Sequence, residues 1–303
     1  MSMLTNEKWP ELLEAGLRVK FDEGRAEIDR SAMAPRLFNV QSSDSAYEEF
    51  ADIHGLRDWF PYKGAIEYVE PVRGWTARIE HQEYVQAVEI ERRFLDDNKY
   101  REITNTVGMM GMSAARTREK HGASVFNNAF SSSYLGGDSV ALCGSHPYLP
   151  TNATTQSNAG STALSATSVA STIGLMGAFK DGNGNHMSVV PDTIIVPPAL
   201  EATAYVALNT PQAPGGANND LNYAASQRWN VVVWKYLTDT TNWFMVDSSL
   251  MKRSLHWFDR VPVEFTIDPK SVYELKMRTR GYMRYSFGWT DWRWIYGHEV
   301  AGA

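Results

Sequence analysis

Cysteine is almost absent from this sequence. Cys143 is the only one among 303 residues, which excludes an internal disulfide and any zinc site built from several cysteines. No apolar run approaches the roughly 20 residues that a membrane-spanning helix needs. The first residues contain no charged segment followed by an apolar core, so we expect no signal peptide. These absences are compatible with assembly in a reducing cytoplasm and predict no membrane partner.

Positive charge is also scarce. The chain carries 29 lysines and arginines against 35 aspartates and glutamates, which gives a net charge of −6. Proteins that bind nucleic-acid phosphates usually carry a basic patch and a basic overall balance. We therefore expect no sequence-specific DNA binding.

The spacings that metal and catalytic sites need are missing as well. No pair of histidines follows the His-x-x-x-His or His-Glu-x-x-His pattern, and no glycine-rich phosphate loop is present. Asp181, Asn183, Asn185 and Asp192 fall at calcium-loop spacing, but His186 replaces the central glycine. A plain turn is the favoured interpretation. We expect no metal and no cofactor.

One short block is similar to a known nucleophile motif. Gly137-Asp138-Ser139-Val140 matches the Gly-Asp-Ser-Leu block of a family of esterases. That chemistry needs a histidine to activate the serine, usually from a late Asp-x-x-His, whereas Asp291 lies seven residues before His298. A structural turn is therefore favoured over catalysis. We expect no enzyme activity, and a serine esterase using Ser139 stays a remote alternative.

Aromatic residues are abundant. The chain has ten Trp and fourteen Tyr, residues that concentrate in cores and protein–protein interfaces. Asn6–Val19 has apolar residues at helical spacing and predicts a short amphipathic helix. Asp22–Ala46 is polar with little periodicity and predicts an extended arm. An ordinary helix and loop is the alternative for this N-terminal region.

Residues Ala65–Arg92 alternate between apolar and polar positions. Period two predicts strands around turns. A ribbon this rich in charged side chains buries little surface on its own subunit, which favours contact with a partner subunit. The residues that we expect at such a contact are Trp75, Arg78, Tyr84, Glu89, Arg92 and Arg93.

A long helix is predicted next. Apolar residues at three- and four-residue steps run from Asp96-Asp97-Asn98, which would cap the helix, to about Phe130. Such a helix is about 50 Å long. Gly108 and Gly111 either weaken it or mark a close crossing. It fits the spine of a shell subunit, with a helix of an ordinary bundle as the alternative.

The rest of the chain mixes short helices with strands. We predict a helix from near Ser165, a strand at Thr193–Val196 and a helix from Ala199. Aromatic-rich strands are predicted at Trp229–Tyr236 and Trp243–Val246, and the chain is β-rich from Leu255 onward. This order predicts the α+β class and not a regular βαβ series.

Several pieces of the sequence, in this order and spacing, resemble the major capsid (head) protein of tailed bacteriophages, most closely the Mu-like head-subunit type. The pieces are Phe21, Ser42-Ser43 with Tyr47, Leu56-Arg57-Asp58-Trp59, Ile90-Glu91-Arg92 with Asp96-Asp97, Gly111 with Ala114-Ala115, Asp138, Leu142 and His146-Pro147. Val196-Pro197-Pro198-Ala199-Leu200-Glu201 and Trp243-Phe244 resemble tailed-phage capsid proteins more generally.

The resemblance implies a Hong Kong 97-type capsid fold. Residues 1–62 would form an N-terminal arm and residues 63–93 an extended β-hairpin loop that overlaps a neighbouring subunit. Residues 94–165 and 251–303 would form the peripheral domain, which contains the spine helix. Residues 166–250 would form the axial domain, whose loops meet at the centre of a capsomer.

The resemblance also implies a function and a set of partners. Such subunits self-assemble through hexamers and pentamers into an icosahedral shell that encloses phage DNA. The implied partners are other copies of the chain, a separate scaffolding protein, a portal and possibly a decoration protein. The protein would be assembled in the cytoplasm of a host bacterium and end in the virion. An encapsulin-like protein nanocompartment is the main alternative.

Overall fold

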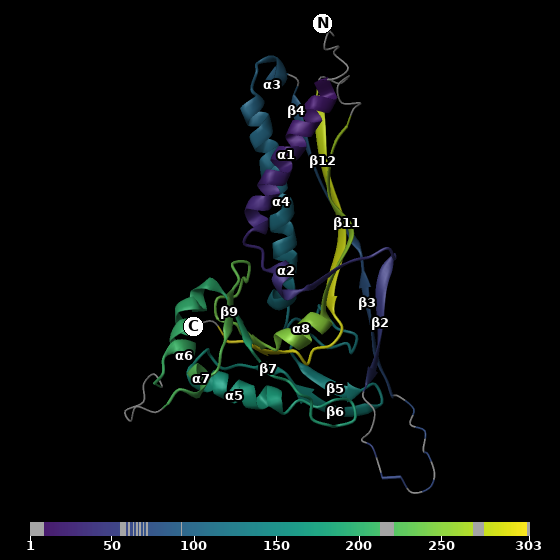
Figure 1. Ribbon diagram of the computed structural model, residues 1–303, viewed down its shortest axis with the longest axis vertical. Helices are drawn as coiled ribbons and strands as arrows, with labels where there is room; N and C mark the ends of the chain where they lie inside the picture. The colour runs from purple at the N-terminus through teal and green to yellow at the C-terminus, as the bar shows by residue number, and fades with distance from the viewer. Residues whose placement is uncertain are drawn as a thin grey trace.

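The computed structural model describes residues 9–54, 72–91, 93–212, 221–268 and 276–301, and also residues 59, 61, 62, 64, 66, 68 and 70. Figure 1 shows an elongated upper half, in which α1 (Trp9–Asp29) and α4 (Tyr100–Asn127) run beside β4 (Gln82–Glu91), β11 (Leu255–Asp268) and β12 (Lys276–Trp289). A lower half carries the short helices and a second sheet. The mixture of helices and strands confirms the expected α+β class.

The predicted spine helix is α4, which packs along α1. The two helices approach so closely that a Cβ on Gly24 would collide with the carbonyl of Gly108, and one on Gly111 with the carbonyl of Phe21. The close crossing predicted from the glycines is therefore present. The predicted cap is wrong, because Lys99 is the N-cap and makes no side-chain cap bond, while residues 93–96 form a separate short helix, α3 (Arg93–Asp96).

The expected extended arm over Asp22–Ala46 is also wrong in its first part, since α1 continues to Asp29. Leu17 and Phe21 explain this, because both are buried in a cluster with Val107 and Met110 of α4. The Phe21 ring also stacks on Phe265 of β11, with 5.1 Å between the ring centroids. Burial of one face stabilises a helix whose sequence is polar elsewhere.

The upper sheet has the strand order β1-β11-β12-β4, in which β1 is Asn39–Ser42. β1 pairs with β11 in parallel, and the other two pairs are antiparallel. Along β12 one face is buried beneath the helices, and its residues are Met277, Thr279, Gly281, Met283 and Tyr285. The opposite face carries charged side chains, as period-two alternation requires.

The expected β-hairpin over residues 63–93 has a different pairing. β3 (Val72–Glu80) pairs with β2 (Tyr47–His54), and β4 pairs with β12 of the upper sheet. The hairpin is thus β2–β3, and the turn at His81 separates it from β4. Periodicity located the strands but could not choose their partners, because the alternating pattern of β4 fits either neighbour.

The lower half is built on a sheet with the order β7-β13-β10-β8-β9. Its strands are β7 (Ala159–Gly160), β13 (Ile295–His298), β10 (Trp243–Val246), β8 (Thr193–Val196) and β9 (Asn230–Val233). β7 and β13 come from segments expected in the peripheral domain, yet they complete the sheet of the expected axial segment. The expected domain boundaries therefore do not separate the two sheets.

Short elements surround this lower sheet, and among them the helix from near Ser165 and the helix from Ala199 were expected from the sequence. The helices are α5 (Ala166–Gly177), the 3-10 turn η1 (Pro198–Leu200), α6 (Glu201–Asn209), α7 (Tyr223–Ser226) and α8 (Ser248–Ser254). β5 (Ser145–Leu149) and β6 (Asn152–Ser157) form a separate hairpin. Ser165 caps α5 in a capping box with Ser168, which confirms the helix start predicted near Ser165.

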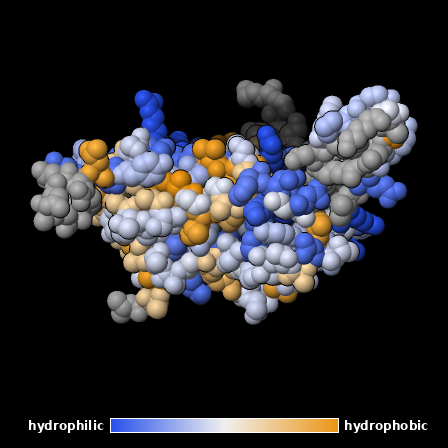
Figure 2. Space-filling model, turned by 90° about the horizontal axis from the view of Figure 1, so that it is seen from below, coloured by the Kyte–Doolittle hydropathy of each residue, from blue (hydrophilic) through white to orange (hydrophobic). Residues whose placement is uncertain are grey.

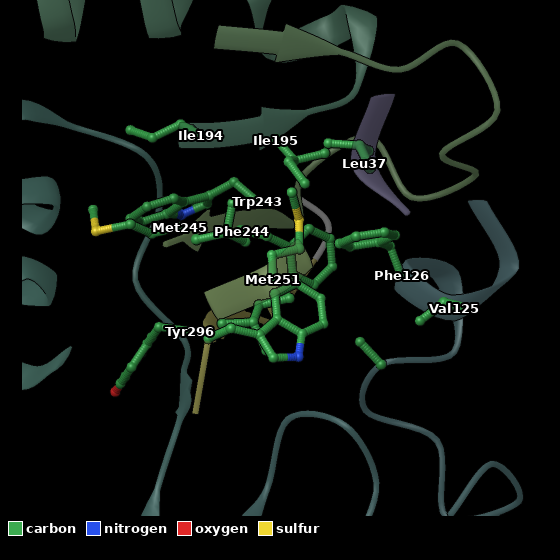
Figure 3. Close-up of a cluster of buried hydrophobic side chains, with 14 of the residues drawn as sticks. Leu37, Val125, Phe126, Ile194, Ile195, Trp243, Phe244, Met245, Met251 and Tyr296 are labelled. Carbon is green, nitrogen blue, oxygen red and sulfur yellow. The ribbon is translucent and has the colours of Figure 1, made fainter. Parts of the chain in front are cut away.

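The main core joins the two halves. Figure 3 shows side chains from α4 (Val125 and Phe126), β8 (Ile194 and Ile195) and α8 (Met251) gathered into one cluster with the apolar residues of β10. The β10 residues Trp243, Phe244, Met245 and Val246 are all buried. The lower end of the spine is therefore part of the lower core.

Candidate functional site: surfaces for self-association

The β2–β3 hairpin is anchored to the upper sheet at its root. The Phe50 ring stacks on His256 and Phe258 of β11, with 4.9 and 5.9 Å between the ring centroids. Ser43 lies within 3.1 Å of His81 Nε2 and donates a hydrogen bond to Glu48. Burial, followed by the nearby positive charge of Arg284, lowers the pKa of His81, so its ring stays neutral at pH 7.

The segment that joins β2 to β3 exposes large apolar side chains. Trp59 and Tyr68 are almost fully exposed, and Tyr62 and Ile66 are about three-quarters exposed. A cluster of this kind on a projecting segment marks an interaction site more often than a solvated loop. The sequence analysis placed no site residue here, although the aromatic residues before Pro71 were a usable signal.

Two of the predicted contact residues lie on β3. Trp75 is half-buried, and the exposed Arg78 forms an ion pair with Glu80 at 2.8 Å. The Arg78 guanidinium also lies 4.0 Å from the centre of the Tyr47 ring on β2. Arg78 thus has partners on its own hairpin, and its role between subunits stays a prediction.

Tyr84 and Glu89 lie on β4 and make contacts within the subunit. Tyr84 stacks on Tyr285 of β12, with 4.6 Å between the ring centroids, and burial raises its pKa. Glu89 accepts hydrogen bonds from Lys276 at 3.0 Å and Arg278 at 2.8 Å, and these two cations lower its pKa. Glu89 therefore contributes to pairing between β4 and β12 of one subunit.

The last two predicted residues sit where the ribbon meets the spine. Arg93, in α3, is exposed and forms an ion pair with Glu91 at 2.6 Å. Arg92 lies outside the described residues. The five described residues of this set do not form one patch, because they spread over β3, β4 and α3.

Three hollows in the surface are lined in part by residues of β3 and β4, between Thr76 and Gln86. The first, about 540 Å³, lies between β3 and residues 133–137, and the second, about 200 Å³, lies beside the end of α4. The third, about 430 Å³, separates β4 from α1 and α4. Among the described residues, β3 pairs only with β2 and β4 only with β12, so each strand has a free edge. Free edges can pair with an extended segment of another chain.

The lower half has a second set of exposed apolar residues that the sequence analysis missed. These residues are Leu175, Tyr205, Val206, Leu221 and Tyr223, from α5, α6 and the segment around α7. In the view from below, hydrophobic residues are interspersed with hydrophilic ones over this face (Figure 2). Tyr205 and Val206 lie opposite the buried Ala204, Ala207 and Leu208, so helical periodicity was a usable signal.

The esterase alternative finds no support in the geometry. Ser139 is exposed with a φ of 61°, which suits a turn. His146 is buried, with its Nδ1 2.5 Å from Asp138 and its ring stacked on Trp292. Its Nε2 has no hydrogen-bond partner in the described part of the chain, so it does not contact the hydroxyl of Ser139. The arrangement lacks an activated nucleophile.

The calcium-loop spacing is likewise a plain turn. Asp181 accepts hydrogen bonds from the backbone N–H groups of Asn183 and Asn185, at 2.9 and 2.8 Å. Asp192 instead accepts from the backbone and hydroxyl of Ser248. The described residues contain no cluster of three side chains that could hold a metal ion.

No helix within the described ranges is long and apolar enough to cross a membrane.

A family model for phage capsid proteins matches residues 76–297, well over half of the chain. The chain belongs to the phage capsid protein family. No curated protein matches it. Three solved capsids share the fold of this capsid protein, which confirms the expected Hong Kong 97-type architecture. The Mu-like subtype agrees with these likenesses.

The likeness to the solved capsids covers most of the chain at low sequence identity. The native GTA particle capsid gives a TM-score of 0.54 at 14% identity, over 90% of this chain and 91% of that chain. The capsid of Cyanophage P-SCSP1u gives 0.55 at 12% identity, over 88% and 87%. The procapsid of bacteriophage JBD30 gives 0.50 at 13% identity, over 97% and 76%.

The family gives a reason to look for contact surfaces on this subunit. A capsid protein is a structural protein of the virion, and its copies form an icosahedral shell. Contacts between copies therefore replace a catalytic centre as the functional site. The exposed hairpin segment, the free edges of β3 and β4, and the apolar residues of the lower half are the surfaces that the described residues offer.

Proposed function

We propose that this subunit assembles through hexamers and pentamers, with the β2–β3 hairpin of one copy lying on a neighbour. The observation that carries the proposal is the near-complete exposure of Trp59 and Tyr68 in the segment that joins β2 to β3. Four large apolar side chains in one segment gain stability only when another surface covers them. The described edges of β3 and β4 that pair with no other strand offer backbone groups to such an extended segment.

The other partners follow from the role of a shell subunit. A separate scaffolding protein would guide closure, a portal would occupy one vertex, and a decoration protein would be optional. Double-stranded DNA would be enclosed without sequence-specific binding, in keeping with the net charge of −6. Assembly would take place in the cytoplasm of the host bacterium.

Protection of the hairpin from labelling tests the proposal. Cys143 is fully buried, so a Tyr62→Cys variant carries one accessible thiol. We expect a maleimide to label this thiol rapidly in the free subunit and at least about tenfold more slowly in assembled shells. The unsubstituted protein, with only Cys143, gives the background. Equal labelling rates in shells and free subunits would refute the hairpin contact.

A further inference from the structure

The short helix α2 (Ala34–Leu37) sits where the upper and lower halves meet. Ala34 and Leu37 are buried, and Leu37 points into the core cluster that also contains Phe126 of the spine and Met251 of α8 (Figure 3). The Phe38 ring that follows lies edge-on to Trp257 of β11 at 5.6 Å. A four-residue helix has no stability of its own, so its neighbours must hold it in place.

A buried carboxylate of the spine holds the first end of α2. Glu119 accepts hydrogen bonds from the backbone N–H groups of Met33 at 3.0 Å and Ala34 at 2.9 Å. Its third bond comes from the indole N–H of Trp234, at 3.1 Å, in the segment that follows β9. One turn along the spine, a Cβ on Gly122 would press against Ala34 and Trp234. The same face of α4 therefore receives both α2 and the lower half.

An ammonium group of α8 holds the other end. Lys252 Nζ donates to the carbonyls of Phe38 at 2.5 Å and Pro35 at 3.4 Å. Burial lowers the pKa of Lys252. A negative charge at the first end and a positive charge at the last both oppose the partial charges of a helix.

We propose that Glu119 and Lys252 are positioning residues that clamp α2 between the spine and the lower half, and so fix the angle between the two halves of the subunit. Each charge belongs to a different element, α4 or α8, and both act on the segment of residues 33–38. Trp234 ties the lower half to the same carboxylate. Any rotation of the lower half against the spine breaks one of these bonds.

The angle between the halves sets the curvature of a shell made from many copies. A small change in this angle adds up around a closed shell, because every subunit carries the same change. The clamp rests on the proposed assembly, and it predicts a specific defect. Subunits in which Glu119 or Lys252 no longer holds α2 should still fold and associate, but the shells that they form should be incomplete or misshapen.

Two variants test the clamp in the full chain. Glu119→Gln places an amide N–H₂ against backbone donors, and Lys252→Met keeps the length of the side chain but removes its charge. The matched controls are Glu102→Gln and Lys235→Met, at exposed positions. With wild-type scaffold present, we expect both clamp variants to give mixed partial and misshapen shells, and both controls to give shells of uniform diameter.

Hydrogen exchange separates positioning from a general loss of stability. In folded Lys252→Met, the amides of residues 33–38 should exchange about tenfold faster, and those of the α1–α4 crossing should not change. The double variant should be no worse than the more severe single variant, since both act on one segment.

Uniform shells and unchanged exchange in Lys252→Met overturn the clamp, even if Glu119→Gln fails to fold. Failure of the unsubstituted protein to form shells counts against the proposed assembly instead.

Discussion

At the scale of single residues, missing side chains matter as much as those present. Gly24 and Gly111 let the backbones of α1 and α4 touch, because a Cβ at either position would collide with a carbonyl of the other helix. The sequence analysis anticipated a close crossing from Gly108 and Gly111. It could not identify Gly24 as the partner, because nothing in the local sequence links residues more than 80 positions apart.

A substitution at this crossing should separate packing from helix propensity. Gly111→Ala forces a methyl group into the Phe21 carbonyl, and we expect it to lower the free energy of unfolding by about 1–3 kcal/mol. Gly16→Ala on α1 has open space around it and should raise stability by about 0.5–1 kcal/mol. Urea unfolding of the unassembled subunit measures both. Equal effects of the two substitutions would contradict the crossing.

A buried histidine predicts how stability depends on pH. His298 lies between Thr162, Thr172 and the Trp243 ring, and burial lowers its pKa from about 6.5 to about 4. Below pH 6.5 the unfolded chain binds a proton that the folded chain does not, so stability falls as the pH drops from 6.5 to 4.

His298→Asn should flatten that pH dependence. Between pH 7 and pH 4.5 the wild type should lose up to about 2–3 kcal/mol more than the variant. Urea unfolding at several pH values between these limits checks this. Parallel stability curves would show that His298 does not titrate in this range.

At the scale of elements, the local sequence predicted where helices and strands lie better than it predicted which strands pair with each other. The spine, the helix after Ser165 and the strands β8, β9 and β10 of the lower sheet were expected from local sequence patterns. The pairing of β4 with β12, nearly 200 residues away in sequence, was not expected. Alternation shows which face of a strand is buried but not which strand lies beside it.

The same limit explains why the described residues among the predicted contact residues do not form one patch. Tyr84 and Glu89 have the composition of interface residues, yet each is engaged by a distant strand of its own subunit. The more exposed residues, Trp59 and Tyr68, lie in the segment that joins β2 to β3. Exposure depends on the whole fold, so sequence periodicity could not find it.

The hairpin element can be tested without disturbing the upper sheet. Replacing residues 55–71 with a short glycine-containing turn leaves the paired part of β2 and β3 and all of β4 in place. We expect the shortened protein to have the thermal stability of the wild type and to form no closed shells. Size-exclusion chromatography with light scattering measures the assembly. Normal shells from this variant would show that the segment is dispensable.

At the scale of the whole molecule, the subunit combines a strong internal core with exposed surfaces that it cannot cover. The core joins the spine to the lower sheet, and α1 packs firmly on α4. The N-terminal helix is thus an integral part of the subunit, and it extends into the segment over which an extended arm was expected. We propose that assembly depends on the hairpin and on the lower face, where many modest contacts repeated around a shell reinforce one another.

Electron microscopy of the purified full-length chain, co-produced with its scaffolding protein, tests the central claim most directly. The account predicts hollow, closed particles of uniform diameter in which the β2–β3 hairpin of each subunit crosses onto the next. A population of monomers with the hairpin folded against its own subunit, and no closed particles at any protein concentration, would contradict it.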